Sequence, residues 1–234
     1  MTKLGIIGAM EIEVAILKSK LENAKVTKVG PMEFYEGKLA GCDVVVVMCG
    51  VGKVHAAMCT QTLCCMFGVT HIVNTGVAGS LDARLDICDV LVSTDAIQHD
   101  MDVTHLGYDV GKVPGLDVQA FPADEKLIRY AFEASEAIRP GHTKMGRVAT
   151  GDQFVNSKAL KEQIIENTGA KCTEMEGGAI AQVAYVNQVP FVILRAISDK
   201  ADDSADMDYP TFEKLAAANC AAVTEALAKR LAEE

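Results

Sequence analysis

Residues Val44–Met48 read Val-Val-Val-Val-Met, a continuous apolar run in which four of the five side chains are β-branched. An unbroken run of this kind is typical of a strand that is buried on both faces of a sheet. Further apolar runs recur along the chain and predict strands at Lys3–Ile7, His71–Asn74, Val90–Ala96, Met145–Ala149 and Phe191–Ile197. The segments Lys25–Val29 and Glu33–Leu39 flank Gly30-Pro31 and predict a hairpin.

Segments with a helical period alternate with these strands. They predict helices at Met10–Leu21, Lys53–Phe67, Asp124–Ala137, Ser157–Asn167, Glu176–Asn187 and Thr211–Ala232. Pro210 fits the opening of the last helix. Strands that alternate with helices indicate an α/β fold, with a mostly parallel or mixed sheet and helices on both of its faces. No linker, low-complexity stretch or internal repeat divides the sequence, so we expect one domain over residues 1–234.

Composition narrows the class of protein. Half of the 234 residues are hydrophobic and 23% are charged, which is ordinary for a globular protein. No apolar run approaches the roughly 20 residues of a membrane span, and the first residues lack the pattern of a secretory signal, so we expect a cytoplasmic protein. The formal net charge of −10, without clustered Lys or Arg, argues against a nucleic-acid partner and is compatible with an uncharged nucleoside. The eight cysteines form no C-x-x-C pair, which favours buried, reduced thiols.

Open α/β sheets bind ligands beyond the carboxyl ends of their strands, so polar residues after apolar runs are candidate site residues. Arg195 interrupts the apolar run that ends at Ser198-Asp199. A buried guanidinium needs an anionic partner, so this arrangement suggests a site. The alternative is that Arg195 reaches the surface and that Asp199 caps a helix.

Two acidic segments are further candidates. Glu174 and Glu176 precede a helix rich in Gly and Ala, and Glu13 lies one turn into the first helix. Ionised carboxylates accept hydrogen bonds and therefore suit ribose hydroxyls. They also favour helix N-termini, and Glu13 could be an ordinary exposed helix residue, so both interpretations stay open.

Four other segments carry weaker signals. The Gly-rich segment Asn74–Ser80 could offer backbone N–H groups to a ligand or be a simple loop. The dinucleotide-binding pattern is incomplete at Gly5–Gly8 and at Gly50–His55, so neither indicates a cofactor. His99–His105 could bind a metal in principle, but its spacing matches no established metal motif and a polar loop is the simpler interpretation.

Seven segments taken together resemble the 5′-methylthioadenosine/S-adenosylhomocysteine nucleosidases of the purine nucleoside phosphorylase superfamily. They occur in the family's order and span nearly the whole chain: GIIGAMEIEV at 5–14, GVGK at 50–53, NTGVAG at 74–79, HDMDVT at 99–104, TGDQF at 150–154, EMEG at 174–177 and RAISD at 195–199. The resemblance implies a single α/β domain with a central, strongly twisted mixed sheet flanked by helices. It also implies a homodimer and a role in methionine salvage.

The implied reaction is hydrolysis of a 5′-thio-substituted adenosine to adenine and a 5-thioribose derivative, with neither metal nor cofactor. By position, Asp199 matches the acid that protonates adenine N7, and Ser198 helps to orient it. Glu13 matches the residue that holds and activates the attacking water, with Arg195 nearby. Met175 and Glu176 match the pair that binds the ribose.

The remaining matches concern the base, the 5′ group and the partner subunit. Phe154 matches the ring that stacks on adenine, and the backbone of Val155 would contact the base edge. Further expected lining residues of the substrate site are Met10, Val77, Ala78, Gly79, Glu174, Tyr209 and Phe212. Val103 and Leu106 match a loop that reaches into the partner's site.

The sequence departs from the family pattern at three of these positions. Val77 stands where many members have Ser, and Leu106 and Tyr209 stand where Phe is frequent. The departures concern the preference for the 5′ group and the placement of the water rather than the class of reaction.

Two other functions remain to be distinguished. A phosphate-dependent purine nucleoside phosphorylase of the same superfamily would need cations around its phosphate, whereas the first loop has none and Glu13 would repel phosphate. A nucleoside-binding module without catalysis would leave the set of Glu13, Glu176 and Asp199 unexplained. The sequence does not rank 5′-methylthioadenosine, S-adenosylhomocysteine, 5′-deoxyadenosine and 6-amino-6-deoxyfutalosine as substrates.

Overall fold

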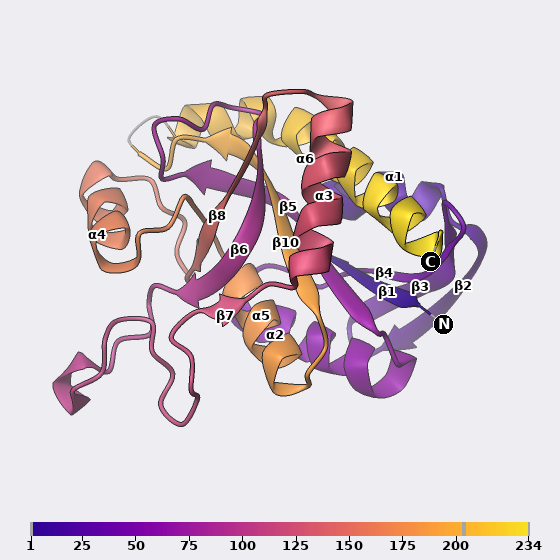
Figure 1. Cartoon of the computed structure of the whole chain (residues 1–234), viewed down its shortest axis with the longest axis horizontal. Coiled ribbons are helices and arrows are strands. Elements are labelled where there is room, and N and C mark those ends of the chain that lie inside the picture. The colour runs from indigo at the N-terminus through magenta and orange to yellow at the C-terminus, as the bar shows by residue number, and fades with distance from the viewer. Residues whose placement is uncertain (1, 203–204, 234) are drawn as a thin grey trace.

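The fold is built on a ten-stranded mixed sheet flanked by helices, as seen in a computed structural model that describes residues 2–202 and 205–233 (Figure 1). Four neighbouring strands run parallel through its centre, in the order β4 (Cys42–Met48), β1 (Lys3–Gly8), β5 (His71–Ser80) and β10 (Phe191–Asp199). Val44–Val47 of β4 are all buried, as their β-branched run predicts. The expected α/β class with a mixed sheet is confirmed.

Strand pairing closes one half of the sheet on itself. The strands β6 (Val90–Gln98), β8 (Thr143–Thr150) and β9 (Cys172–Glu174) link β10 back to β5, because β10 pairs with β6, β6 with β8, β8 with β9, and β9 with β5. The register of this ring sets Gly79 beside both Thr173 and Asp199. Strand ends that are distant in sequence therefore meet at one place.

The other half of the sheet is open. The predicted hairpin is present as β2 (Glu22–Val29) and β3 (Met32–Leu39), which pair antiparallel, and β3 continues the sheet beyond β4. The short strand β7 (Phe121–Pro122) pairs with β6.

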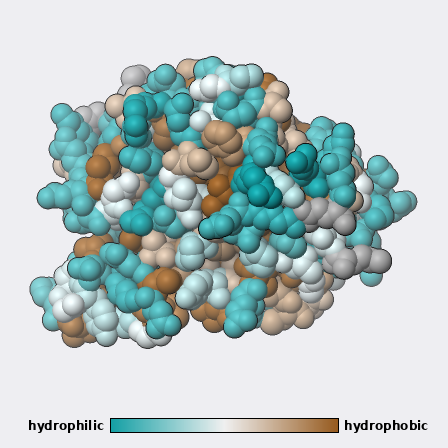
Figure 2. Space-filling model, in the orientation of Figure 1, coloured by the Kyte–Doolittle hydropathy of each residue, from teal (hydrophilic) through white to brown (hydrophobic). Residues whose placement is uncertain are grey.

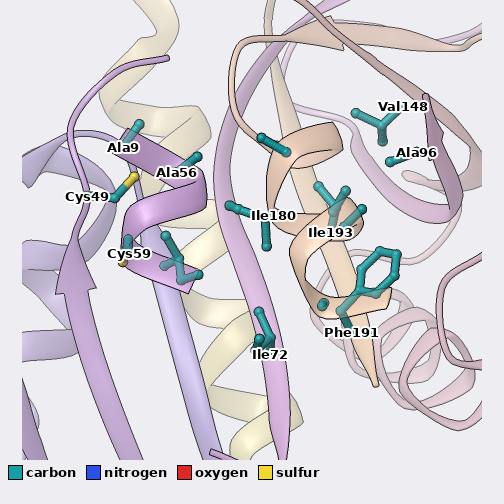
Figure 3. Close-up of a cluster of buried hydrophobic side chains, with 14 of the residues drawn as sticks. Ala9, Cys49, Ala56, Cys59, Ile72, Ala96, Val148, Ile180, Phe191 and Ile193 are labelled. Carbon is teal, nitrogen blue, oxygen red and sulfur yellow. The ribbon is translucent and has the colours of Figure 1, made fainter. Parts of the chain in front are cut away.

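Helices cover both sides of the sheet (Figure 1). Their bounds are α1 (Glu11–Ser19), α2 (Lys53–Thr62, continued by one π-helical turn at Leu63–Phe67), α3 (Glu125–Ile138), α4 (Lys158–Thr168), α5 (Gly177–Val186) and α6 (Ala205–Ala232). The long helix α6 packs on β10 and β5 and contacts α1 and α3, whereas α2 packs against α5. Figure 3 shows the core beneath α2 and α5, where Ala56 and Cys59 meet Ile72, Ile180 and Ile193. None of the helices in the described ranges is both long and apolar enough to cross a bilayer.

Two sequence-based predictions about element ends are wrong. The segment Asn74–Ser80, considered a turn or loop, continues β5, because β10 and β9 pair with it and satisfy its backbone. The last helix begins at Ala205, so Pro210 lies inside it and does not open it. The proline ring holds φ at a value compatible with a helix, and its missing N–H removes one helical hydrogen bond.

Candidate active site

A cavity of about 260 Å³ opens where β5, β9 and β10 end. It is lined by Ala9, Met10, Glu13, Val51, Val77, Ala78, Gly79, Gln153, Phe154, Val155, Thr173, Glu174, Met175, Glu176, Ser198, Asp199 and Tyr209. Its wall is therefore mainly apolar, with four carboxylates and no Lys or Arg among the described residues that line it. A small apolar cavity with a few convergent polar groups is typical of a small-molecule site.

Glu13 is buried at the start of α1 and is held by backbone N–H groups from two elements. Its Oε2 accepts from the N–H groups of Ala9 (2.7 Å) and Met10 (3.0 Å), and its Oε1 accepts from that of Val77 (3.0 Å). A carboxylate has about four acceptor positions, and among the described residues the Val77 N–H is the donor to Oε1, so this oxygen has a further position for a ligand or water. Burial raises the pKa of Glu13 above its ordinary value, although Arg195 and the three N–H groups oppose the rise.

Arg195 lies beneath the cavity rather than in its wall, and only 1% of its surface is exposed. Its Nη2 donates to Asn74 Oδ1 (2.5 Å) and to Glu174 Oε2, and it lies 3.8 Å from Glu176 Oε2. Burial lowers the pKa of Arg195, but Glu174, Glu13 and Glu176 outweigh burial and keep it charged. The guanidinium is thus the positive charge under three carboxylates.

Gly76 allows this arrangement. A Cβ atom at Gly76 would lie 2.2 Å from Nη1 of Arg195 and 2.4 Å from Oε1 of Glu13. No real Cβ tolerates such contacts, so only glycine lets β5 pass this close to the two charged groups.

Glu174 is a structural partner of the site as well as a lining residue. Its Oε1 accepts from the hydroxyl of Thr150, and its Oε2 accepts from Arg195 and from the N–H of Gly177 (2.7 Å) at the start of α5. With both oxygens occupied, Glu174 orients Arg195 and caps α5.

Glu176 points its carboxylate toward the cavity from the residue that precedes α5. Its Oε1 accepts from the N–H of Gly52 (2.8 Å) at the start of α2. Burial, followed by repulsion from Glu174, raises the pKa of Glu176 to about 7. The group therefore changes charge near neutral pH.

Asp199 and Ser198 end β10 at the opposite wall. Asp199 Oδ1 accepts from the N–H of Ala201 (2.8 Å) and its Oδ2 accepts from the hydroxyl of Ser198 (2.9 Å). A Cβ at Gly79 would lie 2.8 Å from Asp199 Oδ1. The two hydrogen bonds thus fix the direction of the carboxyl group, and the missing side chain of Gly79 leaves room for it.

The described residues hold no group of three or more His, Cys, Asp or Glu side chains arranged to bind a metal ion. In the segment His99–His105, Asp100 instead pairs with Lys53 (2.6 Å). The eight cysteines are free thiols.

The architecture and the whole chain can be compared with known proteins. A family model for the phosphorylase superfamily matches residues 3–229. The 5′-methylthioadenosine/S-adenosylhomocysteine nucleosidase of Psychromonas ingrahamii is 41% identical over 231 residues, which cover 98% of this chain and 99% of that protein. The chain belongs to this nucleosidase family.

Solved nucleosidase structures share the fold. The enzyme from Neisseria meningitidis in complex with methylthio-immucillin-A matches with a TM-score of 0.95 at 38% identity, covering 98% of this chain and 100% of that one. A futalosine hydrolase from Helicobacter pylori matches with a TM-score of 0.92 at 33% identity, covering 98% of both chains. The chain is therefore similar in structure both to a 5′-methylthioadenosine/S-adenosylhomocysteine nucleosidase and to a futalosine hydrolase.

Most of the residues singled out in the nucleosidase sequence meet at the cavity. Four do not line it: Arg195 lies beneath it, and Val103, Leu106 and Phe212 lie outside its wall. Phe212 is half-buried in α6, whereas Leu106 is 73% exposed in a loop that extends from the body of the molecule (Figure 1).

Four lining residues were missed by sequence reasoning: Ala9, Val51, Gln153 and Thr173. Ala9, Val51 and Gln153 each lie inside or beside a motif, so neighbourhood alone could have indicated them. Thr173 directly precedes the motif at 174–177, and the pairing of β9 with β5 brings it to the wall. Its buried hydroxyl has no hydrogen-bond partner among residues 2–202 and 205–233.

The mouth of the cavity is aromatic. The rings of Phe154 and Tyr209 meet edge to face with centroids 5.7 Å apart, and the Tyr209 hydroxyl donates to Sδ of Met10 at 3.3 Å. Phe154 remains 46% exposed, so its ring is free to cover a planar ligand.

Proposed function

We propose that the chain hydrolyses the N-glycosidic bond of 5′-thio-substituted adenosines and releases adenine. The observation that carries this proposal is an apolar cavity bordered by Glu13, Glu176 and Asp199, with no cation among its described lining residues. A phosphorylase needs positive charge around its phosphate, and the four carboxylates of this wall would repel a phosphate. Membership of the nucleosidase family supports the same choice of hydrolysis over phosphorolysis.

Asp199 is the general acid in this proposal. It gives a proton to N7 of the purine as the C1′–N9 bond breaks and its electron pair moves onto the base. A protonated purine is the better leaving group, and a positioned general acid contributes about 10²–10⁴-fold. Ser198, which donates to Asp199, fixes the direction of the carboxyl group.

Glu13 is the group that binds the attacking water. The free acceptor position on its Oε1 would take a hydrogen from the water, which then adds its oxygen to C1′ and leaves its proton with Glu13. A raised pKa makes Glu13 a stronger base than an exposed carboxylate. Arg195 acts from below by favouring the ionised form of Glu13.

Glu176 and Met175 bind the ribose in this proposal. The ionised Glu176 would accept from the ribose hydroxyls and stabilise the positive charge that develops on the sugar ring. Met175 offers an apolar surface to the ring.

The rest of the wall recognises the base and the 5′ group. Phe154 would stack on adenine, and the backbone of Val155 would contact the base edge. Met10 and Tyr209 are proposed to surround the 5′-thio substituent, whereas Phe212, which was expected there, lies outside the wall. Val77, Ala78 and Gly79 would form the floor between the base and the water.

Adenine release from four nucleosides tests the function. The chain should release adenine from 5′-methylthioadenosine and from S-adenosylhomocysteine, measured by steady-state kinetics beside 5′-deoxyadenosine and 6-amino-6-deoxyfutalosine. If only the last compound turned over, the chain would act as the futalosine-type relatives are described to act. Binding of all four without any product would indicate a nucleoside-binding module.

The pKa of Glu176 makes a prediction about pH. The value kcat/KM should fall as the pH drops below about 7, by about 100-fold at pH 5, because a protonated Glu176 can neither attract the developing cation nor accept as strongly. Glu176→Gln should have low activity without this acidic limb. A pH profile of both proteins checks the prediction, and a wild-type profile that is flat from pH 5 to 8 would contradict it.

Stability should change in the opposite direction over the same range. The pKa of Glu176 is higher in the folded chain than the ordinary 4.5, so between these values the folded state binds more protons than the unfolded state. Its contribution to stability is therefore present below about pH 4.5 and is lost as the pH rises through about 7. The difference in Tm between the wild type and Glu176→Gln isolates this contribution.

We also propose a homodimer in which Val103 and Leu106 of one subunit complete the site of the other. Exposed apolar side chains support it, since Val54 and Met58 lie one turn apart on α2 and Val51, in the loop before α2, is exposed and also lines the cavity. Figure 2 shows a mostly hydrophilic face with hydrophobic residues interspersed, some of them at the lower left, where Figure 1 places the extended loop. A second copy on α2 would cover apolar area beside the cavity mouth.

Val54→Asp should shift the dimer to monomers in analytical ultracentrifugation and reduce activity on dilution. Val26→Asp is the matched control, because Val26 is also exposed but lies on β2 at the open side of the sheet. A wild-type chain that is monomeric and fully active at assay concentration would overturn the dimer. A cytoplasmic location and a role in methionine salvage stay predictions; eight free thiols are compatible with a reducing compartment.

A further inference from the structure

Three motifs outside the catalytic set are tied together beside the cavity. Asp100 Oδ1 accepts from Nζ of Lys53 (2.6 Å), and Asp100 Oδ2 accepts from the N–H of Asp152 (3.0 Å). Asp152 Oδ1 in turn accepts from the N–H of Lys53 (2.8 Å). These contacts form a closed ring through the loops that begin α2, follow β6 and follow β8.

The ring of contacts is linked to the proposed ribose-binding residue Glu176 through Gly52. Gly52 precedes Lys53, and its N–H donates to Glu176 Oε1 at 2.8 Å. Its φ is +96°, in the region that favours glycine, and a Cβ there would lie 3.0 Å from Asp152 Oδ1. Asp152 therefore packs on the glycine whose N–H faces Glu176.

We propose that Asp100 and Asp152 are positioning residues, which hold the start of α2 so that the Gly52 N–H stays on Glu176 and hold the loop that carries Phe154 over the cavity. The proposal rests on the proposed function, in which Glu176 binds the ribose. Surface ion pairs alone contribute little to stability. Here, however, two of the three contacts are made to backbone N–H groups, so they fix the course of the chain rather than only joining side chains.

The groups around Glu176 define what a loss of the ring would do. Burial and the carboxylates of Glu174 and Glu13 favour its protonated form, whereas Arg195 and the Gly52 N–H favour its ionised form. The thiol of Cys49 also lies close enough to interact. Releasing the Gly52 N–H removes one of the two groups that favour ionisation, so Glu176 would titrate at a higher pH.

The test compares Asp152→Ala and Asp100→Ala with Asp152→Asn, whose amide oxygen can still accept from the Lys53 N–H. Two measurements are made: the pH profile of kcat/KM for 5′-methylthioadenosine, and the titration of the Glu176 carboxyl carbon by ¹³C NMR, assigned with Glu176→Gln. Asp43→Ala is the matched control, because Asp43 also pairs with a lysine (Lys38, 2.7 Å) but lies at the β3–β4 hairpin.

Both alanine variants should move the acidic limb and the NMR midpoint upward by about one pH unit, which lowers kcat/KM at pH 7 by about fivefold and leaves it nearly normal at pH 9. Asp152→Asn and Asp43→Ala should match the wild type within about threefold. The double variant Asp100→Ala/Asp152→Ala should lose little more than either single variant, since both act through one contact.

A deficit that is the same at every pH, with an unmoved NMR midpoint, would overturn the positioning role and leave only a structural one. Losses that multiply in the double variant would also contradict it. If the wild type released no adenine, the proposed function would fail, and the NMR titration would still decide whether the ring controls Glu176.

Discussion

Asp199→Asn should abolish adenine release while substrate still binds. Asparagine has the same shape, and it can keep both local contacts, because its amide oxygen can accept from the Ala201 N–H while its amide nitrogen donates to the Ser198 oxygen. What it lacks is a proton that can be transferred to N7. We expect kcat to fall by at least about 10³-fold, within the range that a general acid contributes.

Single-turnover adenine release and calorimetric binding of 5′-methylthioadenosine measure the two properties separately. Ser198→Ala is the control, because it removes only the hydroxyl that orients Asp199 and should lower kcat by about tenfold or less. A near-normal kcat in Asp199→Asn would show that another group protonates the base. A loss of binding with unfolding would show instead that the aspartate holds the end of β10 together.

Glu13→Gln should be nearly inactive, with kcat reduced by about 10²–10⁴-fold. The carboxylate accepts from three backbone N–H groups on both of its oxygens, whereas the amide can accept on one side only. In glutamine the amide N–H₂ would face at least one backbone N–H, so that two donors meet. The variant also loses the negative charge that interacts with Arg195. The attacking water loses its base for the same reason.

Val77→Ser is the contrasting variant at the same place. Its new hydroxyl could help to hold the water beside Glu13, as the serine of many family members would, and we expect kcat to change by less than about tenfold. Thermal unfolding of both variants separates chemistry from folding. Full activity in Glu13→Gln, or a transition-state-analogue complex without a water within hydrogen-bonding reach of Glu13, would refute its role.

The strands were predictable where local sequence determines them. Val44–Val47 are buried in the strand that their β-branched run predicts, and only Met48 at its end is exposed. The strand β9 was missed because three residues, Cys172–Glu174, carry no period, and it forms only because β5 and β8 flank it. The end of β5 was also missed, because its glycines resemble those of a turn. Gly76 is needed there because side chains from elsewhere in the chain, Arg195 and Glu13, leave no room for a Cβ.

The sequence indicated most of the residues of the site, but not where each of them lies. Arg195 in an apolar strand indicated a buried anionic partner, and the structure supplies it as Glu174. Sequence could not reveal that the guanidinium lies under the cavity, because its position depends on Asn74 and Glu174, which are far apart in the chain. Likewise, the acids of the motifs HDMDVT and TGDQF gained a role only when folding joined them to Lys53.

The most direct test of hydrolysis is the product formed from 5′-methylthioadenosine in the presence and absence of inorganic phosphate. The chain should release adenine at the same rate in both conditions and yield free 5-methylthioribose, because the described wall of the cavity offers carboxylates and no cation to phosphate. Mass spectrometry of the sugar product decides the matter. A rate that depends on phosphate, with 5-methylthioribose 1-phosphate as the product, would contradict the account.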